Sequence, residues 1–395
     1  MLRTVLFAAV LAVATPAVAQ VEVVPLAAPD AFSTPGRDTG LPADLWAGTP
    51  VETARTVLPL LGARPLSPAA AVLARRLLAT GARGPEGSAG DDTLAGQRAS
   101  ALLALGDVAA AARILDRAPG LERNAELSRA AAEAALLAGD APRACRIAEG
   151  LATGRGEAYW LRLRAFCQAE AGQPAQAQLT FDLAQAQGRD VVYGRLMTAK
   201  LAGAAPGAAS LRNGLDLALS RSLNLDLAAA KPSPAVAAAL SGAEPPPPVF
   251  DTSAIDAQIG GLGASVLQGL PPEGALSALI AAAADADAKT RPRLQGAALL
   301  LAALANDLPG PDRLRVSAFA IPEGKAPAGR NLALEAAADA RRAGEAALLA
   351  LWTSAEAGVA GPALPDRVRI VRVLARAGFA DEARLFVLEG LAGLK

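Results

Sequence analysis

The chain has few of the side chains that commonly carry catalysis. Its 395 residues include two cysteines and no histidine. Without histidine there is no Ser-His-Asp triad, no Cys-His pair and no histidine metal ligand. Two cysteines alone do not complete the usual four-ligand zinc set. We therefore predict no catalytic, cofactor or metal site, and we interpret the protein as a non-enzyme.

The densest aromatic group belongs to one predicted helix that also carries two arginines. Trp160 and Phe166 are six residues apart, so they do not share one narrow stripe of that helix. One interpretation is packing against neighbouring helices. The other is a partner-binding surface, because aromatic and arginine residues dominate binding hot spots. The candidate partner-binding residues are Tyr159, Arg162, Arg164 and Arg195.

Carboxylates offer little further chemistry. Asp285 and Asp287 are two positions apart, so on a helix they point about 200° apart and do not form a pair. Glu133, Glu149 and Glu170 are interpreted as residues of solvated helix faces. A general acid among them would require an apolar pocket around it.

Composition narrows the class of protein. Hydrophobic residues make up 52% of the chain, which is too much for a wholly disordered protein, and alanine accounts for 101 positions. Lys plus Arg and Asp plus Glu both number 38, and this zero net charge argues against a nucleic-acid partner. The excess of Arg, Ala, Gly and Pro is typical of a GC-rich bacterial genome.

The first 19 residues have the pattern of a secretory signal peptide. Arg3 provides the positive n-region, an apolar run covers 5–14, and the sequence from Ala17 to Ala19 is a cleavage motif of the A-x-A type. We expect cleavage after Ala19 and export to the periplasm or beyond. No later apolar run reaches the roughly 20 residues of a transmembrane helix, so no membrane-spanning segment is predicted after signal removal.

Prolines and glycines divide the rest of the chain. Residues 20–49 hold four prolines, which predicts an extended or disordered arm. Helical patterns occupy 50–240. Pro245–Pro248 mark a proline-rich linker over 241–252, because four consecutive prolines do not fit inside a helix. A second helical, repeat-like half follows over 253–395.

An internal repeat runs through the first helical part. Gly106, Gly139 and Gly172 are spaced 33 residues apart. An alanine lies five residues after each glycine and an acidic residue lies ten after. Asp107 and Asp140 directly follow two of the glycines and suit the N-cap of a second helix. Each unit is therefore predicted to be a helix, a tight glycine turn and a second helix.

This layout resembles the tetratricopeptide repeat (TPR), which has a period of about 34 residues. Ala132, Gly139 and Ala144 match the family's small residue in helix A, its turn glycine and its small residue in helix B. The large aromatic positions mostly depart from the family, although Phe181 matches one of them. The resemblance implies an all-α, TPR-like helical-hairpin solenoid with degenerate repeats, which binds peptides or protein segments.

The repeat register also places the two cysteines. Cys145 falls in helix B of the second unit and Cys167 in helix A of the third, and these helices are neighbours in a solenoid. In an oxidising compartment this predicts a disulfide. The alternative is two small, buried apolar residues.

The same spacing returns near the C-terminus. Gly378 is predicted to be a turn, with Ala383 five residues after it, and Gly344 lies 34 residues before it as the preceding turn. Residues 308–330 are rich in Pro and Gly and predict a long loop, which is uncommon unless it is functional.

These observations favour an exported, non-enzymatic scaffold or adaptor that binds a protein or peptide partner in the cell envelope. One alternative is an accessory helical protein of peptidoglycan metabolism; an enzymatic role there would require a cleft with one acid of raised pKa. Another is a self-assembling structural envelope protein, because uncapped solenoid ends favour stacking. For that alternative, Phe386, Val387 and Leu391 are the residues that would form an apolar outer face on the last helix.

Overall fold

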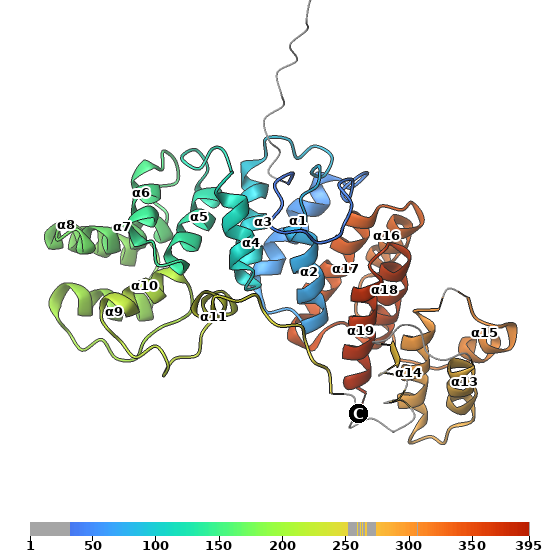
Figure 1. The fold of residues 1–395 in the computed structure, drawn as a ribbon. Helices are drawn as coiled ribbons and strands as arrows, with labels where there is room; N and C mark the ends of the chain where they lie inside the picture. The colour runs from blue at the N-terminus through green and yellow to red at the C-terminus, as the bar shows by residue number, and fades with distance from the viewer. Residues whose placement is uncertain are drawn as a thin grey trace, which may run out of the picture.

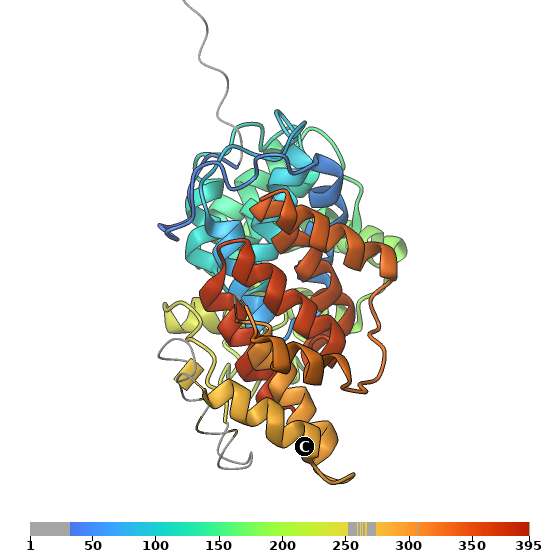
Figure 2. The ribbon, with the colours of Figure 1, turned by 90° about the vertical axis from the view of Figure 1, so that its right-hand side faces the viewer.

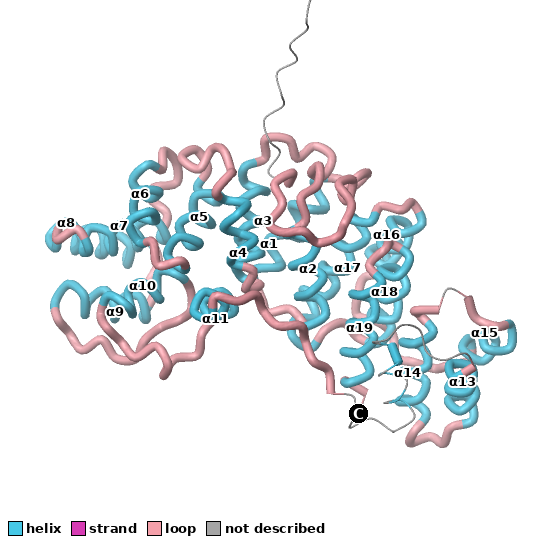
Figure 3. Tube along the Cα trace, in the orientation of Figure 1, coloured by secondary structure: helices cyan, strands magenta, loops and turns pink. Residues whose placement is uncertain are grey.

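The computed structural model describes residues 32–251, 259, 261, 263, 265–266, 274–305 and 307–394. Within these ranges the regular structure is helical, and no β-strand occurs beyond one isolated bridge between Pro50 and Glu86 (Figure 3). The all-α prediction is confirmed. The predicted signal segment 1–19 and arm residues 20–31 lie outside the described residues.

The first part of the chain forms consecutive helices joined by turns and loops. They are α1 (Val51–Ala63), α2 (Pro68–Ala79), α3 (Asp92–Ala104), α4 (Val108–Leu115), α5 (Ala125–Leu137), α6 (Ala141–Gly150), α7 (Ala158–Glu170), α8 (Pro174–Gln187), α9 (Val191–Ala202), α10 (Gly214–Ser222) and α11 (Pro234–Ser241). Short polar side chains begin several of them. The Asp107 carboxylate accepts from Ala110 N at 3.3 Å, and that of Asp140 accepts from Arg143 N at 2.9 Å.

The three repeat glycines form the turns that their spacing predicts. Gly106, Gly139 and Gly172 have φ values of 80°, 80° and 72° and lie between α3 and α4, α5 and α6, and α7 and α8. A left-handed backbone favours glycine because it lacks the Cβ that would clash with the carbonyl. Each turn therefore reverses the chain within two or three residues.

The described part of the N-terminal arm is not helical and packs on the helices. Phe32 and Trp46 are each about 1% exposed, and their rings meet edge to face with centroids 5.6 Å apart. Arg98 of α3 is fully buried and donates to the carbonyl oxygens of Thr34 and Thr80. These contacts hold residues 32–34 against α2 and α3.

The second part of the chain is also helical. Its helices are α13 (Ala275–Asp285), α14 (Arg291–Ala302), α15 (Gly310–Ser317), α16 (Ala328–Asp339), α17 (Ala343–Ala357), the 3₁₀ turn η1 (Gly358–Ala360), α18 (Leu364–Arg376) and α19 (Ala380–Ala392). Two predictions are wrong here. Residues 308–330 are not one long loop, because Pro309-Gly310-Pro311 begins α15 and α16 starts at Ala328.

The second wrong prediction concerns Gly344, which is not a turn. It lies inside α17, where a Cβ would come within 2.7 Å of the Leu45 carbonyl oxygen, so its missing side chain admits the arm. The left-handed turn between α16 and α17 is formed by Arg341, with φ of 56°. Gly378, with φ of 90°, does form the turn between α18 and α19.

The two parts of the chain form one row of helices whose order in space differs from the order in sequence (Figures 1 and 2). From α1 the row runs through α3, α5, α6 and α7 to α8 at one end. On its other side, α1 packs against α17, and α2 packs against α17 and α19. Beyond them, α14 and α13 continue the row. On the lower side in Figure 1, α9 lies beneath α7 and α8, α10 packs against α5, and α11 packs against α5 and α3.

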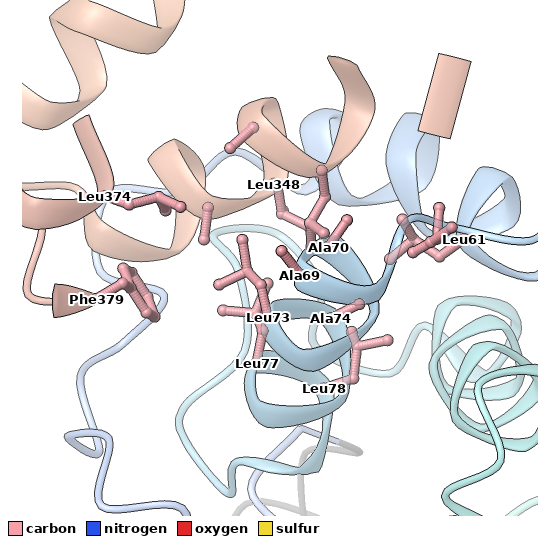
Figure 4. Packing of buried hydrophobic residues seen from close by; sticks show 14 of the residues in the cluster. Leu61, Ala69, Ala70, Leu73, Ala74, Leu77, Leu78, Leu348, Leu374 and Phe379 are labelled. Carbon is pink, nitrogen blue, oxygen red and sulfur yellow. The ribbon is translucent and has the colours of Figure 1, made fainter. Parts of the chain in front are cut away.

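A continuous core joins the beginning of the chain to its end. Leu73 and Leu77 of α2 are completely buried beside Leu348, Leu374 and Phe379 (Figure 4). Polar contacts reinforce this junction, since Ala69 N donates to Glu389 Oε2 at 2.8 Å and Arg76 binds both carboxylate oxygens of Glu382.

The last helix is therefore not an exposed end. Phe386, Val387 and Leu391 are 0% exposed, which contradicts the outer apolar face considered for them, because α19 packs between α18, α14 and α2. Among the described residues, no helix is long and apolar enough to cross a membrane.

Candidate functional site

A cavity of about 1140 Å³, which we call the inner groove, lies between the first helices of the row and the returning segment. Its lining comes from α1 and the turn after it, from α2, α3, α5 and α7, and from the first residues of α9. Residues 212–216, 233–238 and 241–246 close the opposite side. The groove therefore depends on segments far apart in the sequence.

One part of the inner groove is apolar. Leu58 and Leu61 of α1, Ala101 and Ala104 of α3, and Ala237 of α11 contribute to it. Small side chains on α3 and α11 leave the volume open, because alanine extends only one carbon beyond the backbone. This wall suits aliphatic or aromatic groups of a ligand.

The other part of the groove is polar and organised around Asp190. Asp190 caps α9 by accepting from Val192 N and Tyr193 N, both at 3.1 Å. Arg212 Nη2 donates to both of its carboxylate oxygens at 3.1 Å. Burial opposes its ionisation, but the Tyr193 N–H and Arg212 hold the pKa of Asp190 below its usual value.

Arg162 and Tyr193 form the adjoining part of this polar wall. Arg162 Nη2 donates to the Gly188 carbonyl oxygen at 2.6 Å, and its guanidinium carbon lies 5.7 Å from the centre of the Tyr193 ring. The Tyr193 hydroxyl donates to the Arg162 carbonyl oxygen at 2.9 Å. These contacts fix both side chains, so the wall is preformed.

Glu133 lies at the base of the groove and is not on a solvated face as its sequence suggests. Its Oε2 accepts from Gly214 N at 2.7 Å, and its Oε1 is shielded from solvent. Burial raises the pKa of Glu133. The buried Tyr159 hydroxyl beside it has a pKa well above its usual value because of burial and the Glu133 charge. The Arg129 guanidinium stacks 4.9 Å from the centre of the Tyr159 ring.

The four candidate partner-binding residues separate into two pairs. Tyr159 and Arg162 line the inner groove. Arg164 donates to the Arg155 and Trp160 carbonyl oxygens, and Arg195 donates to Ala208 O at 2.8 Å; neither lines the groove. Residues 162 and 164 are about 200° apart around α7, so a single groove does not receive both.

The other aromatic residues of α7 are packing residues. Trp160 and Phe166 are each 1% exposed and belong to a core with Leu163 and Tyr193. Of the aromatic group, Tyr159 alone reaches the groove, since neither Trp160 nor Phe166 lines it.

The structure joins Cys145 of α6 to Cys167 of α7 through a disulfide, with their Cα atoms 5.6 Å apart. The bond links the second helix of one hairpin to the first helix of the next. Neither cysteine lines the inner groove.

Several groove residues have no clear signal in the sequence. Arg129 resembles any other helix-surface arginine, Arg212 an ordinary arginine before a helix, and Asp216 an ordinary acid in a first helical turn. Asp216 is 1% exposed and accepts from Ser210 Oγ and Arg212 Nε, both at 2.6 Å. The Arg212–Asp216 pair, four residues apart, is the one local pattern that points to this network.

The groove thus offers an apolar wall, a preformed polar wall and an exposed Arg129 between them. This arrangement provides shape, apolar contact and hydrogen bonding for a ligand. In comparisons with known proteins, the chain matches no family model, no curated protein and no solved structure.

Proposed function

We propose that this protein is an exported, non-enzymatic adaptor that binds a segment of a partner polypeptide in the inner groove. The observation that carries the proposal is the groove itself. Its volume of about 1140 Å³ exceeds the roughly 300–1,000 Å³ of common small-molecule pockets. Its neighbouring apolar and polar walls suit a peptide, which presents side chains and backbone amides together.

The arrangement of the helices supports a TPR-like mode of binding. The first helices of three successive hairpins, α3, α5 and α7, all contribute to the groove. Left-handed glycines separate these helices from their partners. In stacked hairpins, first helices side by side create an extended surface for a partner segment.

Glu133 bears on the enzymatic alternative because an acid of raised pKa in a cleft is what glycoside cleavage requires. Its oxygens are poorly placed for proton transfer to a substrate. Oε2 accepts from Gly214 N, and Oε1 is shielded from solvent. We therefore assign Glu133 to holding α10 in place and keep the non-enzymatic proposal.

The proposed location rests on the N-terminal sequence. Mass spectrometry of the N-terminal peptide of the protein from its bacterial host should place the first residue at Gln20, as glutamine or as its cyclised pyroglutamate form, because cleavage after Ala19 follows the A-x-A rule. An intact Met1 on the mature protein would contradict export by this route.

The binding proposal is tested with a variant that fills the groove. Ala237 is half-buried and lines the groove, so Ala237→Trp should occupy the space of a bound segment. Ala109 is exposed on α4 outside the groove, which makes Ala109→Trp the matched control. Both variants and the native protein are used to capture partners from an envelope extract, with identification by mass spectrometry.

We expect the native protein and the Ala109→Trp variant to capture a partner. The Ala237→Trp variant should fail to capture it. Titration calorimetry with peptides from that partner should then give an affinity at least about tenfold weaker for Ala237→Trp, equivalent to about 1.4 kcal/mol. Equal capture of the partner by all three proteins would contradict binding in the inner groove.

A further inference from the structure

One free end of the helix row is α8. Its main contacts are with α7 and α9, which cover one side of it. In Figure 1, α8 lies at the extreme left of the row with no helix beyond it. The packing of helix on helix stops at α8, as it also does at the other end of the row, where the main contacts of α15 are with α13.

Part of the uncovered side of α8 is apolar. Leu179 is 64% exposed and Leu183 is 51% exposed, one helical turn apart. Asp182 is the one charged residue of the helix, and Gln178 Nε2 donates to its Oδ1 at 2.9 Å. Burying this surface would therefore remove apolar area from water with little cost in charge desolvation.

The exposed residues of this side follow a self-complementary order. We call six of them the α8 stripe, namely Ala175, Gln176, Leu179, Leu183, Ala186 and Gln187; Gln178 and Asp182 are also exposed and lie along one edge of the stripe. Counted from the buried Phe181, a leucine lies two positions away on each side. Five and six positions away lie Gln176 and Ala175 on the N-terminal side, and Ala186 and Gln187 on the C-terminal side.

Helix geometry predicts how the α8 stripes of two copies would pair. In an antiparallel pair centred on Phe181, Leu179 of one copy faces Leu183 of the other. On one flank Ala175 lies beside Ala186, and on the other Gln176 lies beside Gln187, where two amides exchange hydrogen bonds. A two-fold axis generates every contact twice, so both leucines are covered in both copies.

We propose that the α8 stripe pairs with the α8 stripe of a second copy, antiparallel and centred on Phe181. The occupant is a second copy because the pattern complements itself and because such pairing continues the packing of helix on helix along the row. Two rows would then join end to end into one row of double length. The inner groove plays no part in this contact, so the inference is independent of the proposed binding function.

A single helix pair buries less surface than the roughly 1,200 Å² of small stable interfaces. The dimer is therefore weak and reversible. Sedimentation equilibrium of the purified protein from about 5 to 500 μM should show the average mass rising with concentration toward twice that of the monomer.

Leu179→Lys with Leu183→Lys should abolish this rise, because opposed ammonium groups replace the leucine contacts. The matched control is Leu332→Lys, since Leu332 is 70% exposed on α16 at a distance from α8. The control should associate as the native protein does. Thermal unfolding of all variants should coincide, because the substituted side chains are exposed.

Cross-linking tests the register. An equimolar mixture of Leu179→Cys and Leu183→Cys chains should form an intermolecular disulfide at least about fivefold faster than either variant alone, because these positions face each other across the axis. A native protein that stays monomeric up to about 500 μM, or a double lysine variant that associates equally, would overturn the proposal.

Discussion

The Glu133 carboxylate is a buried charge at the base of the inner groove. It faces Arg129 on its own helix, Tyr159 on α7, and Gly214 N–H and Asp216 of α10. Burial raises its pKa above the unfolded value of about 4.3. Between the two pKa values the native state binds more protons, so stability falls as pH rises through this window.

Glu133→Gln removes that ionisation while its amide oxygen still accepts from Gly214 N. The unfolding free energy of the variant, relative to the native protein, should therefore increase from pH 4 to pH 7. Urea unfolding at both pH values measures it. Glu149→Gln, at an exposed position, is the control and should show no such change. A difference that is equal at both pH values would contradict the buried charge.

Arg98 is a fully buried guanidinium that binds main-chain oxygens. Nε donates to Leu78 O at 2.7 Å, and Nη2 donates to Thr80 O at 2.8 Å and Thr34 O at 3.2 Å. Arg98→Met leaves these carbonyl oxygens buried without their donor. We expect a loss of about 3 kcal/mol in unfolding free energy, measured by urea unfolding.

Arg143 gives the matched control for this measurement. It pairs with Asp116 through partly exposed side chains, with Nη2 and Oδ1 2.6 Å apart. Arg143→Met should cost less than about 1 kcal/mol, because exposed ion pairs contribute little. Similar losses for both variants would argue against a special role of Arg98 in fixing the arm.

At the scale of elements, Gly96 sets the approach of α3 to α5. A Cβ at this position would lie 2.6 Å from Leu127 N and 2.8 Å from the Glu126 carbonyl carbon. Backbone atoms cannot move aside alone, so Gly96→Ala must push the helices apart. We expect a loss of about 2 kcal/mol or more by urea unfolding, although alanine has the higher helix propensity.

Gly172→Ala is the comparison within the same set of helices. Space around Gly172 is open, with no heavy atom within 4 Å of an added Cβ, and its φ is 72°. This substitution should lower the free energy of unfolding by about 1–2 kcal/mol, because an alanine in the left-handed conformation is strained but meets no neighbouring atom. A neutral effect of Gly96→Ala would mean that the two helices adjust without cost.

The predictable elements are those whose signals are local. The turn glycines and the Asp107 and Asp140 caps are confirmed because a left-handed turn and an N-cap depend on one residue and its immediate neighbours. Arg341 forms the same turn without glycine, and no sequence pattern marks it. The turn predicted at Gly344 is wrong because glycine is needed there for close contact with the arm, some 300 residues earlier in the chain.

The site was less predictable because other segments complete it. Glu133 belongs to α5, but its partner Gly214 N lies 81 residues later, on a helix that returns beneath the row. Tyr159 and Arg162 line the groove, and their residue types alone made them candidates for a binding surface. Arg164 shares that composition and points elsewhere, which residue type alone does not reveal.

At the scale of the whole molecule, the two parts of the chain depend on each other. A protein ending at residue 251 would lack α17 and α19 and expose Leu73 and Leu77 of α2. Exposing each leucine lowers the free energy of unfolding by about 1.5–3 kcal/mol, and the net free energy of unfolding of a protein is only about 5–15 kcal/mol. We expect no cooperative thermal transition from this fragment, and one transition from the whole protein. A fragment that melts cooperatively near the temperature of the whole protein would contradict this dependence.

The junction of α2 with α19 also bears on how quickly the protein reaches its native state. The bond from Ala69 N to Glu389 Oε2 joins residues 320 positions apart. Contacts of such separation slow folding, because the loop they close must be ordered before they form. Because a chain is synthesised from its N-terminus, its first helices form early, and the helices that cover them are made last. Its nascent form therefore presents Leu73 and Leu77 to other molecules for most of its synthesis, which makes it a natural client for a holding chaperone.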